Sequence, residues 1–208
     1  MKNRVCFGTT GGVFLLMILL FAACSSTPPV KYYTLNTLSE MKQNISEDAS
    51  SDHMVIGLGP VAFPKYLNRP QIVIRQSPNR VKVSEFNRWA SPFQEEFLRV
   101  LAKNISILLP MSRVAVYPWT DQFSPTHRIK LNVEQFDGRF KDHVVLDVTW
   151  SLTLQKDEND PVVKNSLIKE ALSTEDYEAI VAAKSRAIAK LSQEIVSVIN
   201  TISKKDNN

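Results

Sequence analysis

The feature that most constrains the fold of this chain is the alternation of apolar and polar side chains in residues 143–155. The apolar side chains that share one side of this segment are Val144, Leu146, Val148, Trp150, Leu152 and Leu154. A period of two predicts a strand with one buried and one wetter face. Residues 128–136 are also rich in β-forming side chains, and Asp137-Gly138 follows them. We therefore expect a long hairpin with its turn near Asp137-Gly138.

Other segments rich in β-forming residues predict further strands. These are residues 30–37, 54–62, 113–117 and 162–172, together with a hairpin of 71–75 and 81–86 around the turn at 77–80. Residues 38–52 are polar, with several serines, and predict a mobile connection. Residues 63–70 predict a loop bounded by two prolines.

Two segments have the signature of amphipathic helices. Ser91 is expected to be the N-cap of the first, with Pro92 at the first helical position and Gln94 completing a capping box. Its apolar stripe comprises Phe93, Phe97, Leu98, Leu101, Ile105 and Leu108, and Pro110 stops it. Ser173 or Thr174 is expected to cap the second helix. Its stripe comprises Tyr177, Ile180, Val181, Ile188, Leu191, Ile195, Val198 and Ile202.

These patterns predict an α+β fold, with a mainly antiparallel sheet and two amphipathic helices packed on one face. The expected organisation is a single domain over residues 30–203, followed by a flexible, solvent-exposed tail over residues 204–208.

The N-terminus has the pattern of an export signal. Lys2 and Arg4 precede an apolar run at residues 13–21, which is too short for a membrane span. Small residues then lead to Cys24, as signal peptidase II requires, although Phe21 stands where such sites usually have leucine. We predict a signal peptide at residues 1–23 and a lipidated tether at residues 24–29, with an N-acyl diacylglycerol on Cys24. The alternative is an ordinary signal with an incidental cysteine.

Cysteine count and charge exclude several classes of protein. Only Cys6 and Cys24 occur, and Cys6 leaves with the signal, so the mature chain has no internal disulfide. The formal charge of +4 falls to +2 when Lys2 and Arg4 are lost, because the signal contains no acidic residue. This charge is too small to indicate binding to nucleic acid.

The chemistry-bearing residues form no recognisable catalytic pattern. His127 and His143 flank the same hairpin, so they either approach each other or are exposed at strand ends. Asp142-His143 resembles an acid–base pair, but no serine in a nucleophile turn accompanies it. No Cys and His spacing matches a metal site. We therefore predict no catalytic residue, no metal and no cofactor other than the acyl anchor.

Aromatic residues at strand ends or in loops leave two interpretations open. They are Tyr66, Trp89, Tyr117 and Trp119. Either they line a ligand pocket, or they cover the rim of the core.

Several motifs carry a resemblance to a known family. They are Tyr32-Tyr33-Thr34-Leu35, Ile56-Gly57-Leu58-Gly59-Pro60-Val61, Pro64-Lys65-Tyr66-Leu67-Asn68-Arg69-Pro70-Gln71-Ile72-Val73 and Arg88-Trp89-Ala90-Ser91-Pro92. In these the chain resembles the PqiC-type auxiliary lipoproteins of ABC-type and intermembrane transport systems. The resemblance implies a non-enzymatic accessory subunit that works with a periplasmic protein carrying mammalian-cell-entry (MCE) domains, in lipid transport that maintains envelope integrity. It implies no catalytic residue.

Localisation and partners follow as expectations from this resemblance. Ser25 stands where an aspartate would favour the inner membrane, so we expect an anchor in the inner leaflet of the outer membrane, with the domain facing the periplasm. The expected partners are the MCE-domain protein and, through a ring-like assembly, further copies of this chain. The alternatives are a stand-alone lipid-binding lipoprotein and a periplasmic hydrolase.

The segments most specific to the resemblance, Phe63–Pro70 and Asn87–Pro92, predict a contact surface for a partner. Its candidate residues are Tyr66, Arg69, Arg88 and Trp89, whose side chains have polar or amphipathic tips. The alternative is that the two arginines hold their own loops by bonding backbone carbonyls.

Overall fold

The computed structural model of the chain describes residues 28–41, 54–120 and 123–206. The predicted signal peptide, Cys24 and most of the predicted mobile connection lie outside these residues. Among the residues that are described, no helix combines the length and the apolar character needed to cross a membrane.

The larger of two sheets has five strands in the order β5-β2-β6-β7-β8. They are β2 (Val55–Ala62), β5 (Arg113–Val116), β6 (His127–Gly138), β7 (His143–Leu154) and β8 (Val162–Ala171). Strands β6, β7 and β8 pair antiparallel, whereas β2 pairs parallel with both β5 and β6. The sheet is therefore mixed, because the pairing of β2 is parallel where the sequence predicted a mainly antiparallel sheet. The predicted α+β class is unaffected.

The long hairpin predicted from the alternating pattern is confirmed, with one difference at its turn. Strand β6 continues through Asp137 and Gly138, and Gly138 is paired with Val144. A Cβ atom on Gly138 would lie 2.7 Å from side-chain atoms of both Val144 and Ile180. Gly138 is thus a close-packing position rather than a turn residue, and the turn falls at residues 139–142.

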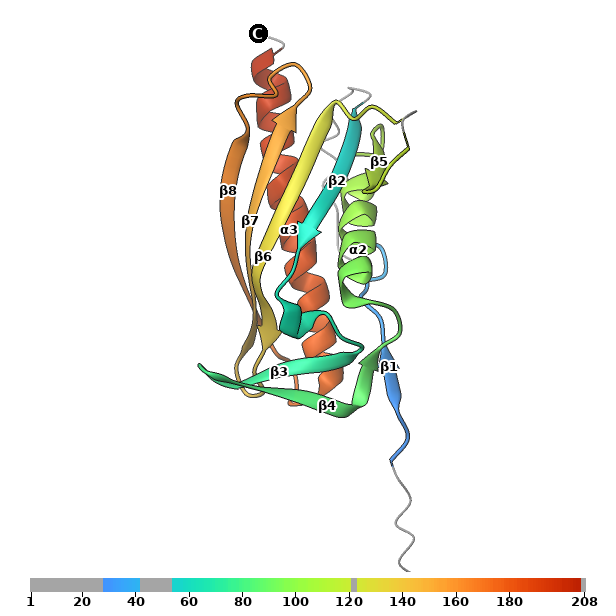
Figure 1. Cartoon of the computed structure of the whole chain (residues 1–208), viewed down its shortest axis with the longest axis vertical. Helices are drawn as coiled ribbons and strands as arrows, with labels where there is room; N and C mark the ends of the chain where they lie inside the picture. Colours follow the sequence, from blue (N-terminus) through green and yellow to red (C-terminus); the bar gives the residue numbers. More distant parts are fainter. Residues whose placement is uncertain (1–27, 42–53, 121–122, 207–208) are drawn as a thin grey trace, which may run out of the picture.

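The smaller sheet has three strands in the order β1-β4-β3 and crosses the lower end of the molecule (Figure 1). They are β1 (Lys31–Tyr33), β3 (Gln71–Ser77) and β4 (Arg80–Trp89), and the short helix η1 (Lys65–Leu67) precedes β3. Strands β3 and β4 form the predicted hairpin, while β1 pairs parallel with β4. The first described residues lie at this end, and the C-terminal end of the chain lies at the other (Figure 1).

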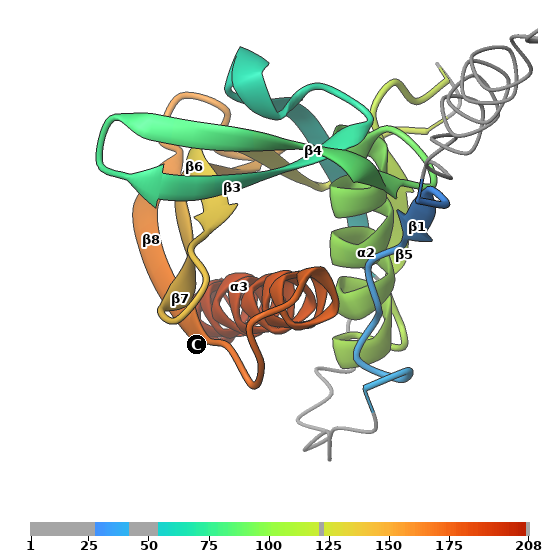
Figure 2. The ribbon, with the colours of Figure 1, turned by 90° about the horizontal axis from the view of Figure 1, so that it is seen from below.

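Both predicted helices are present and pack on the five-stranded sheet. Helix α2 (Phe93–Leu108) contacts β2 and β5, and helix α3 (Tyr177–Asp206) contacts β7, β8 and α2. The view from below shows the two helices side by side (Figure 2). The α+β class is therefore confirmed. Helix α3 also extends to Asp206, so the first residues of the predicted tail are helical.

Both helices begin later than the sequence predicted. The N-cap of α2 is Pro92 rather than Ser91, and it makes no side-chain capping bond. The Ser91 hydroxyl instead donates to Glu96 Oε1 at 2.8 Å, because the buried Glu96 carboxylate requires donors. At the start of α3, Asp176 Oδ1 accepts a hydrogen bond from the Ala179 amide at 2.8 Å, so Asp176, not Ser173 or Thr174, caps this helix.

The first strand is shorter than predicted because the residues after it pack on α2. Leu35 and Leu38 are fully buried. The Leu38 amide donates to Asn104 Oδ1 at 2.8 Å, and Arg99 Nη2 donates to the Leu35 carbonyl at 3.1 Å. These side-chain partners replace the ladder that a longer strand would need.

A cluster of aromatic side chains in the core connects the two sheets. Phe63 packs edge-on against Phe93 and Phe97, with ring centroids 5.7 and 5.1 Å apart. Trp89, at the end of β4, stacks on Phe93 at 4.5 Å. The three-stranded sheet is therefore anchored on the same helix that covers the larger sheet.

Candidate functional site

The structure brings together the two segments predicted to form a contact surface. The Trp89 amide donates to the Pro70 carbonyl at 2.7 Å, and Gln71 is paired with Arg88 across β3 and β4. The Ala90 amide donates to the Tyr33 carbonyl at 2.9 Å, which ties β1 to the same corner. The loop at 63–70 and the corner at 87–92 are thus neighbours at the lower end of the molecule.

A row of side chains lies across the three strands at this corner. Tyr32 on β1 is paired with Arg88 on β4, which is paired with Gln71 on β3. Residues paired directly across neighbouring strands project from the same face of a sheet. Tyr32 is 65% exposed, and Arg69 is exposed next to this row. We call Tyr32, Arg69, Gln71 and Arg88 the contact surface.

The two arginines of the contact surface have unused hydrogen-bonding capacity. Arg88 Nε is buried and has no hydrogen-bond partner among the residues that the structure describes. Among the described residues, neither Arg69 nor Arg88 forms a salt bridge or a side-chain hydrogen bond, so nothing there supports the alternative that they hold their own loops. Because an arginine side chain donates but does not accept, the groups that fit this surface are acceptors such as carboxylates, phosphates and carbonyls.

Two of the predicted contact residues are directed into the protein. Trp89 is 4% exposed, because it neighbours Arg88 on β4 and therefore points to the opposite face of the strand, onto Phe93. In this structure Trp89 is therefore part of the core rather than of the contact surface, and its binding to a partner stays untested. Tyr66 is half-buried, and its hydroxyl donates to Asp137 Oδ2 at 2.7 Å. Partner binding by the exposed residues remains a prediction.

Asp137 is the centre of a buried polar network that sequence analysis did not identify. Arg75 forms two hydrogen bonds with its carboxylate, from Nε to Oδ1 at 2.9 Å and from Nη2 to Oδ2 at 2.7 Å. Gln135 donates to Oδ1 at 2.8 Å. Burial by itself raises the pKa of Asp137, but the hydrogen bonds from Arg75, Tyr66 and Gln135 outweigh it and lower the pKa overall. Burial and the bond to Asp137 raise the pKa of Tyr66 to about 12.

Lys184 lies in the core close to this network. Its ammonium lies 4.2 Å from the ring centroid of Phe136 and 4.5 Å from that of Phe93, and it donates to the Phe136 carbonyl. Burial lowers the pKa of Lys184 to about 7, and the negative charge of Asp137 opposes this shift. The sequence signal was available, because Lys184 lies four residues from both Ile180 and Ile188 on the apolar stripe of α3.

The Asp137 network links two parts of the fold. Both Asp137 oxygens accept bonds from fixed donors, so the carboxylate joins the small sheet to the end of β6. His127 and His143 begin successive antiparallel strands, and therefore lie at opposite ends of the hairpin and do not approach each other. The Asp142 and His143 side chains do pair. In the described part of the chain, no group of three His, Cys, Asp or Glu side chains is placed to hold a metal ion.

Comparison with known proteins places this fold among transport accessory proteins. The chain is 28% identical over 183 residues to the intermembrane transport lipoprotein PqiC of Escherichia coli K12, covering 85% of this chain and 92% of that protein. The PqiC lipoprotein of Shigella flexneri matches to the same extent.

Solved structures support the fold. One uncharacterised protein, 22% identical, superimposes with a TM-score of 0.67 over 83% of this chain and 99% of its own. A Xanthomonas campestris protein, 12% identical, superimposes with a TM-score of 0.69 over 85% of this chain and 99% of its own.

The family model for the ABC-type transport auxiliary lipoprotein component matches residues 33–196. The chain therefore belongs to the family of ABC-type transport auxiliary lipoproteins.

Proposed function

We propose that this protein is an outer-membrane-anchored, periplasmic accessory subunit of an MCE-type intermembrane lipid transport system. Two observations support a role of this kind. The family is one of transport accessory lipoproteins rather than enzymes. The curated relatives carry the name intermembrane transport lipoprotein.

The contact surface is the observation that carries the proposal. It lies beside β1, whose first residue, Lys31, is seven positions after Cys24. At roughly 3.3–3.6 Å per extended residue, a tether of this length spans at most about 25 Å. An acylated Cys24 therefore keeps the domain near its membrane, with the contact surface on the tethered end, and the distant partner must come to the domain.

The chemistry of the contact surface selects the kind of partner. Tyr32 offers an exposed ring, Arg69 offers an exposed guanidinium group, and Arg88 offers an Nε that has no acceptor among the described residues. Tyr and Arg are among the residues that most often dominate binding energy at protein interfaces. We therefore propose an acidic or carbonyl-rich surface on the MCE-domain protein as the acceptor, with further copies of this chain as neighbours in the assembly.

Replacing Arg69 and Arg88 together with alanine tests the docking. We expect binding of the mature lipoprotein to the purified MCE-domain partner to weaken at least about tenfold, with a reduced dependence on salt. The matched control is Arg80→Ala, which removes an exposed arginine at the turn of the same hairpin. Unchanged melting of all three proteins would separate docking from folding. Normal partner binding by the double variant would contradict the proposal.

The anchor is tested separately at Cys24. In Cys24→Ala, we expect intact-mass measurement to find no acyl groups and the signal at residues 1–23 still attached, because signal peptidase II requires the lipidated cysteine. In the wild type, each buried methylene of an acyl chain contributes about 0.8 kcal/mol to membrane attachment of the mature protein. Ser25→Asp should move the lipidated protein to the inner membrane. A mature wild-type protein without acyl mass would refute the lipoprotein assignment.

A further inference from the structure

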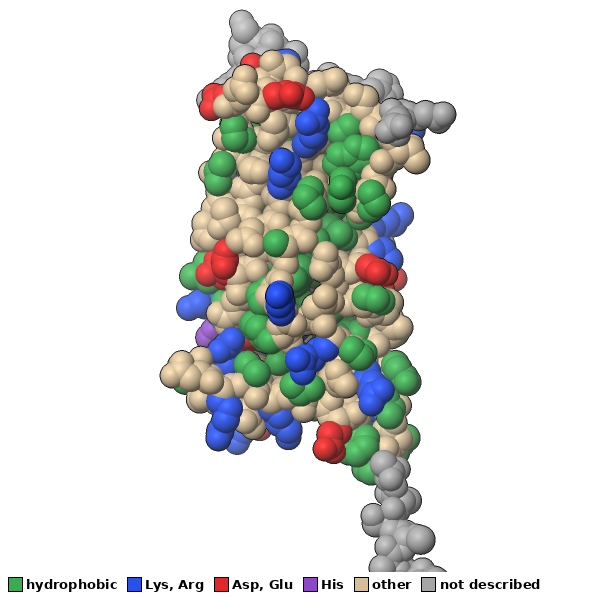
Figure 3. All heavy atoms as spheres, viewed as in Figure 1, with side chains coloured by type: hydrophobic (Ala, Val, Ile, Leu, Met, Phe, Trp, Pro, Cys, Tyr) green, Lys and Arg blue, Asp and Glu red, His purple; other side chains and the backbone are tan. Residues whose placement is uncertain are grey.

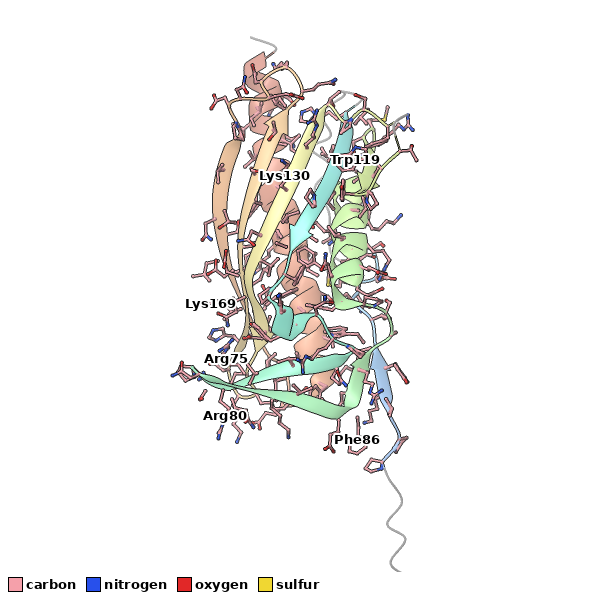
Figure 4. All side chains as sticks on the ribbon, viewed as in Figure 1. Arg75, Arg80, Phe86, Trp119, Lys130 and Lys169 are labelled. Carbon is pink, nitrogen blue, oxygen red and sulfur yellow. The ribbon has the colours of Figure 1, made fainter. Side chains whose placement is uncertain are left out.

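A second candidate site lies at the end of the molecule away from the contact surface. An open hollow of about 360 Å³ there is lined by Gly59, Tyr117, Trp119, Phe123, Arg128 and Lys130, among others. We call it the aromatic hollow. Figure 3 shows hydrophobic side chains beside Lys and Arg side chains on the upper part of this face, where Figure 4 labels Trp119 and Lys130.

Two glycines of β2 let the aromatic rings lie close against the strand. A Cβ atom on Gly57 would lie 3.0 Å from atoms of both Trp119 and Pro125. Gly59 has a φ of +113°, which residues other than glycine rarely adopt. A Cβ atom there would lie 2.9 Å from Tyr117 Cβ. The hollow is therefore built into the backbone, because larger residues at either position would displace its walls.

The walls combine aromatic rings with positive charge. Trp119 packs edge-on against Tyr117 at 5.3 Å and lies 6.0 Å from Phe123, and Tyr117 remains 50% exposed. Arg128 forms an exposed salt bridge with Glu158 at 2.6 Å. Lys130 is exposed and has no ion pair with any residue that the structure describes. The aromatic hollow thus offers a place for a ring or an apolar side chain next to an unpaired cation.

The aromatic hollow continues into a second hollow on the face of the five-stranded sheet opposite α2 and α3. This sheet hollow, of about 480 Å³, shares Pro60 and Lys130 with the first. Lys130 is paired with Ser151, and Ser151 with Val163, so the three residues form one row across β6, β7 and β8. Val163 is 60% exposed. Together the hollows form a groove with aromatic rings at one end, a lysine in the middle and an apolar edge.

We propose that this groove binds an extended acidic and aromatic segment of a partner polypeptide, with an aromatic side chain in the aromatic hollow and a carboxylate at Lys130. The aromatic hollow is at the small end of the size range of ligand pockets. It has room for one ring and a carboxylate, and because both hollows are open to solvent, acyl chains lying in the groove would stay exposed to water. One unpaired lysine is also too little positive charge for a nucleic acid. This proposal uses a surface separate from the contact surface and does not depend on it.

Short labelled peptides test the groove on the mature lipoprotein in nanodiscs. The probe is fluorescein-labelled Gly-Asp-Phe-Asp-Gly, with Gly-Lys-Phe-Lys-Gly and Gly-Asp-Ala-Asp-Gly as comparisons, measured by fluorescence anisotropy. We expect saturable binding of the first peptide and at least about tenfold weaker binding of the other two. Equal binding of all three peptides, or no binding of the first, would overturn the proposal.

Charge variants assign the binding to this groove. Lys130→Glu should weaken binding of the acidic aromatic peptide at least about tenfold with unchanged melting. The matched control Lys169→Glu makes the same charge change at an exposed position lower on the sheet (Figure 4) and should bind normally. The Arg69→Ala, Arg88→Ala double variant should also bind the peptide normally, so failure of the two proposals can be told apart.

Two further outcomes would assign the groove to another occupant. If Lys130→Glu changed binding to phosphatidylglycerol vesicles but not to the peptide, the groove would be a lipid site. If it changed only the size of the assembly in sedimentation, the groove would be an interface between copies of this chain. Either result would overturn the peptide proposal.

Discussion

At the scale of single residues, buried charges determine the character of the junction between the two sheets. Asp137 is 1% exposed and its partner Arg75 is 22% exposed. Lys184 is 1% exposed and is surrounded by aromatic rings. A buried charge that loses its partner raises the free energy of the folded state, whereas an exposed charge carries no such penalty. The junction should therefore respond strongly to changes in either partner and to pH.

Loss of Arg75 should destabilise the protein because it leaves Asp137 buried without its main donor. In Arg75→Met we expect the free energy of unfolding at pH 7 to fall by about 3–5 kcal/mol, towards the lower limit because Arg75 still reaches solvent. Without Arg75, burial dominates and the pKa of Asp137 rises. The deficit should therefore narrow as pH falls and the carboxyl becomes neutral. Urea unfolding between pH 4 and 7 measures both effects.

Arg80→Met is the control for this prediction, because Arg80 is exposed at the start of β4 in the same hairpin. It should change the free energy of unfolding by less than about 0.5 kcal/mol. A deficit in Arg75→Met that stays constant from pH 4 to 7 would argue against the assigned role of Asp137.

Lys184 should make stability depend on pH in the alkaline range. Its pKa is about 7 in the folded protein and is lowered from 10.5 by burial. Between these values the unfolded chain binds more protons, so the free energy of unfolding rises with pH, by at most about 1.4 kcal/mol per pH unit. Lys184→Met should abolish this rise while other titrating groups remain. Urea unfolding at pH 7 to 9 gives the two slopes, and equal slopes would show that Lys184 is not the titrating group.

At the scale of elements, the ends of helices and strands were set by side-chain partners rather than by local propensity. The Ser91 hydroxyl donates a hydrogen bond to the buried Glu96 instead of capping the helix, and α2 begins after Pro92. Asp176 caps α3 in place of Ser173 or Thr174, and Thr174 donates to Asp176 instead, at 2.8 Å. Ser173, Thr174 and Asp176 are all residue types that can cap a helix, so the sequence does not distinguish them. In the structure Asp176 is the cap.

The cap of α3 can be tested with a matched pair of variants. Asp176→Ala removes the acceptor of the Ala179 amide and a negative charge near the positive end of the helix dipole, so it should lower the melting temperature by a few degrees. Ser173→Ala should leave the melting temperature unchanged. Thermal unfolding followed by circular dichroism compares the two, and an equal effect of both substitutions would contradict the assignment of Asp176.

At the scale of the whole molecule, the two ends of the domain carry different surfaces. The lower end holds the contact surface next to β1, and the opposite end holds the aromatic hollow (Figures 1 and 4). The sheets are joined by the aromatic cluster and the Asp137 network, so the ends are parts of one packed body. A domain with separate surfaces at its two ends suits an accessory subunit that holds a transport partner near a membrane.

The same arrangement predicts that the histidines are dispensable. His127 and His143 lie at opposite ends of the β6–β7 hairpin and cannot act on one substrate together. The variants His127→Ala and His143→Ala should each complement an envelope defect of the deletion strain as well as the wild type does. Loss of complementation by a folded variant would reopen the hydrolase interpretation.

The sequence by itself determined the features that depend on local periodicity. The alternation in residues 143–155, the hairpin at 71–86 and the two amphipathic stripes predicted β7, the β3–β4 pair, α2 and α3, because each pattern reports which face of an element is buried. The family motifs likewise identified the corner that carries Arg69 and Arg88.

The tertiary structure decided what depends on residues far apart in the chain. Arg75 and Asp137 are separated by 62 positions, so no local pattern links them. The parallel pairing of β2 with β5 and β6 is likewise a property of the assembled sheet. Trp89 and Arg88 were predicted to share a surface, but Trp89 packs on Phe93 in the core, whereas Arg88 projects from the opposite face of β4. Burial and charge pairing are long-range quantities, and only the folded chain fixes them.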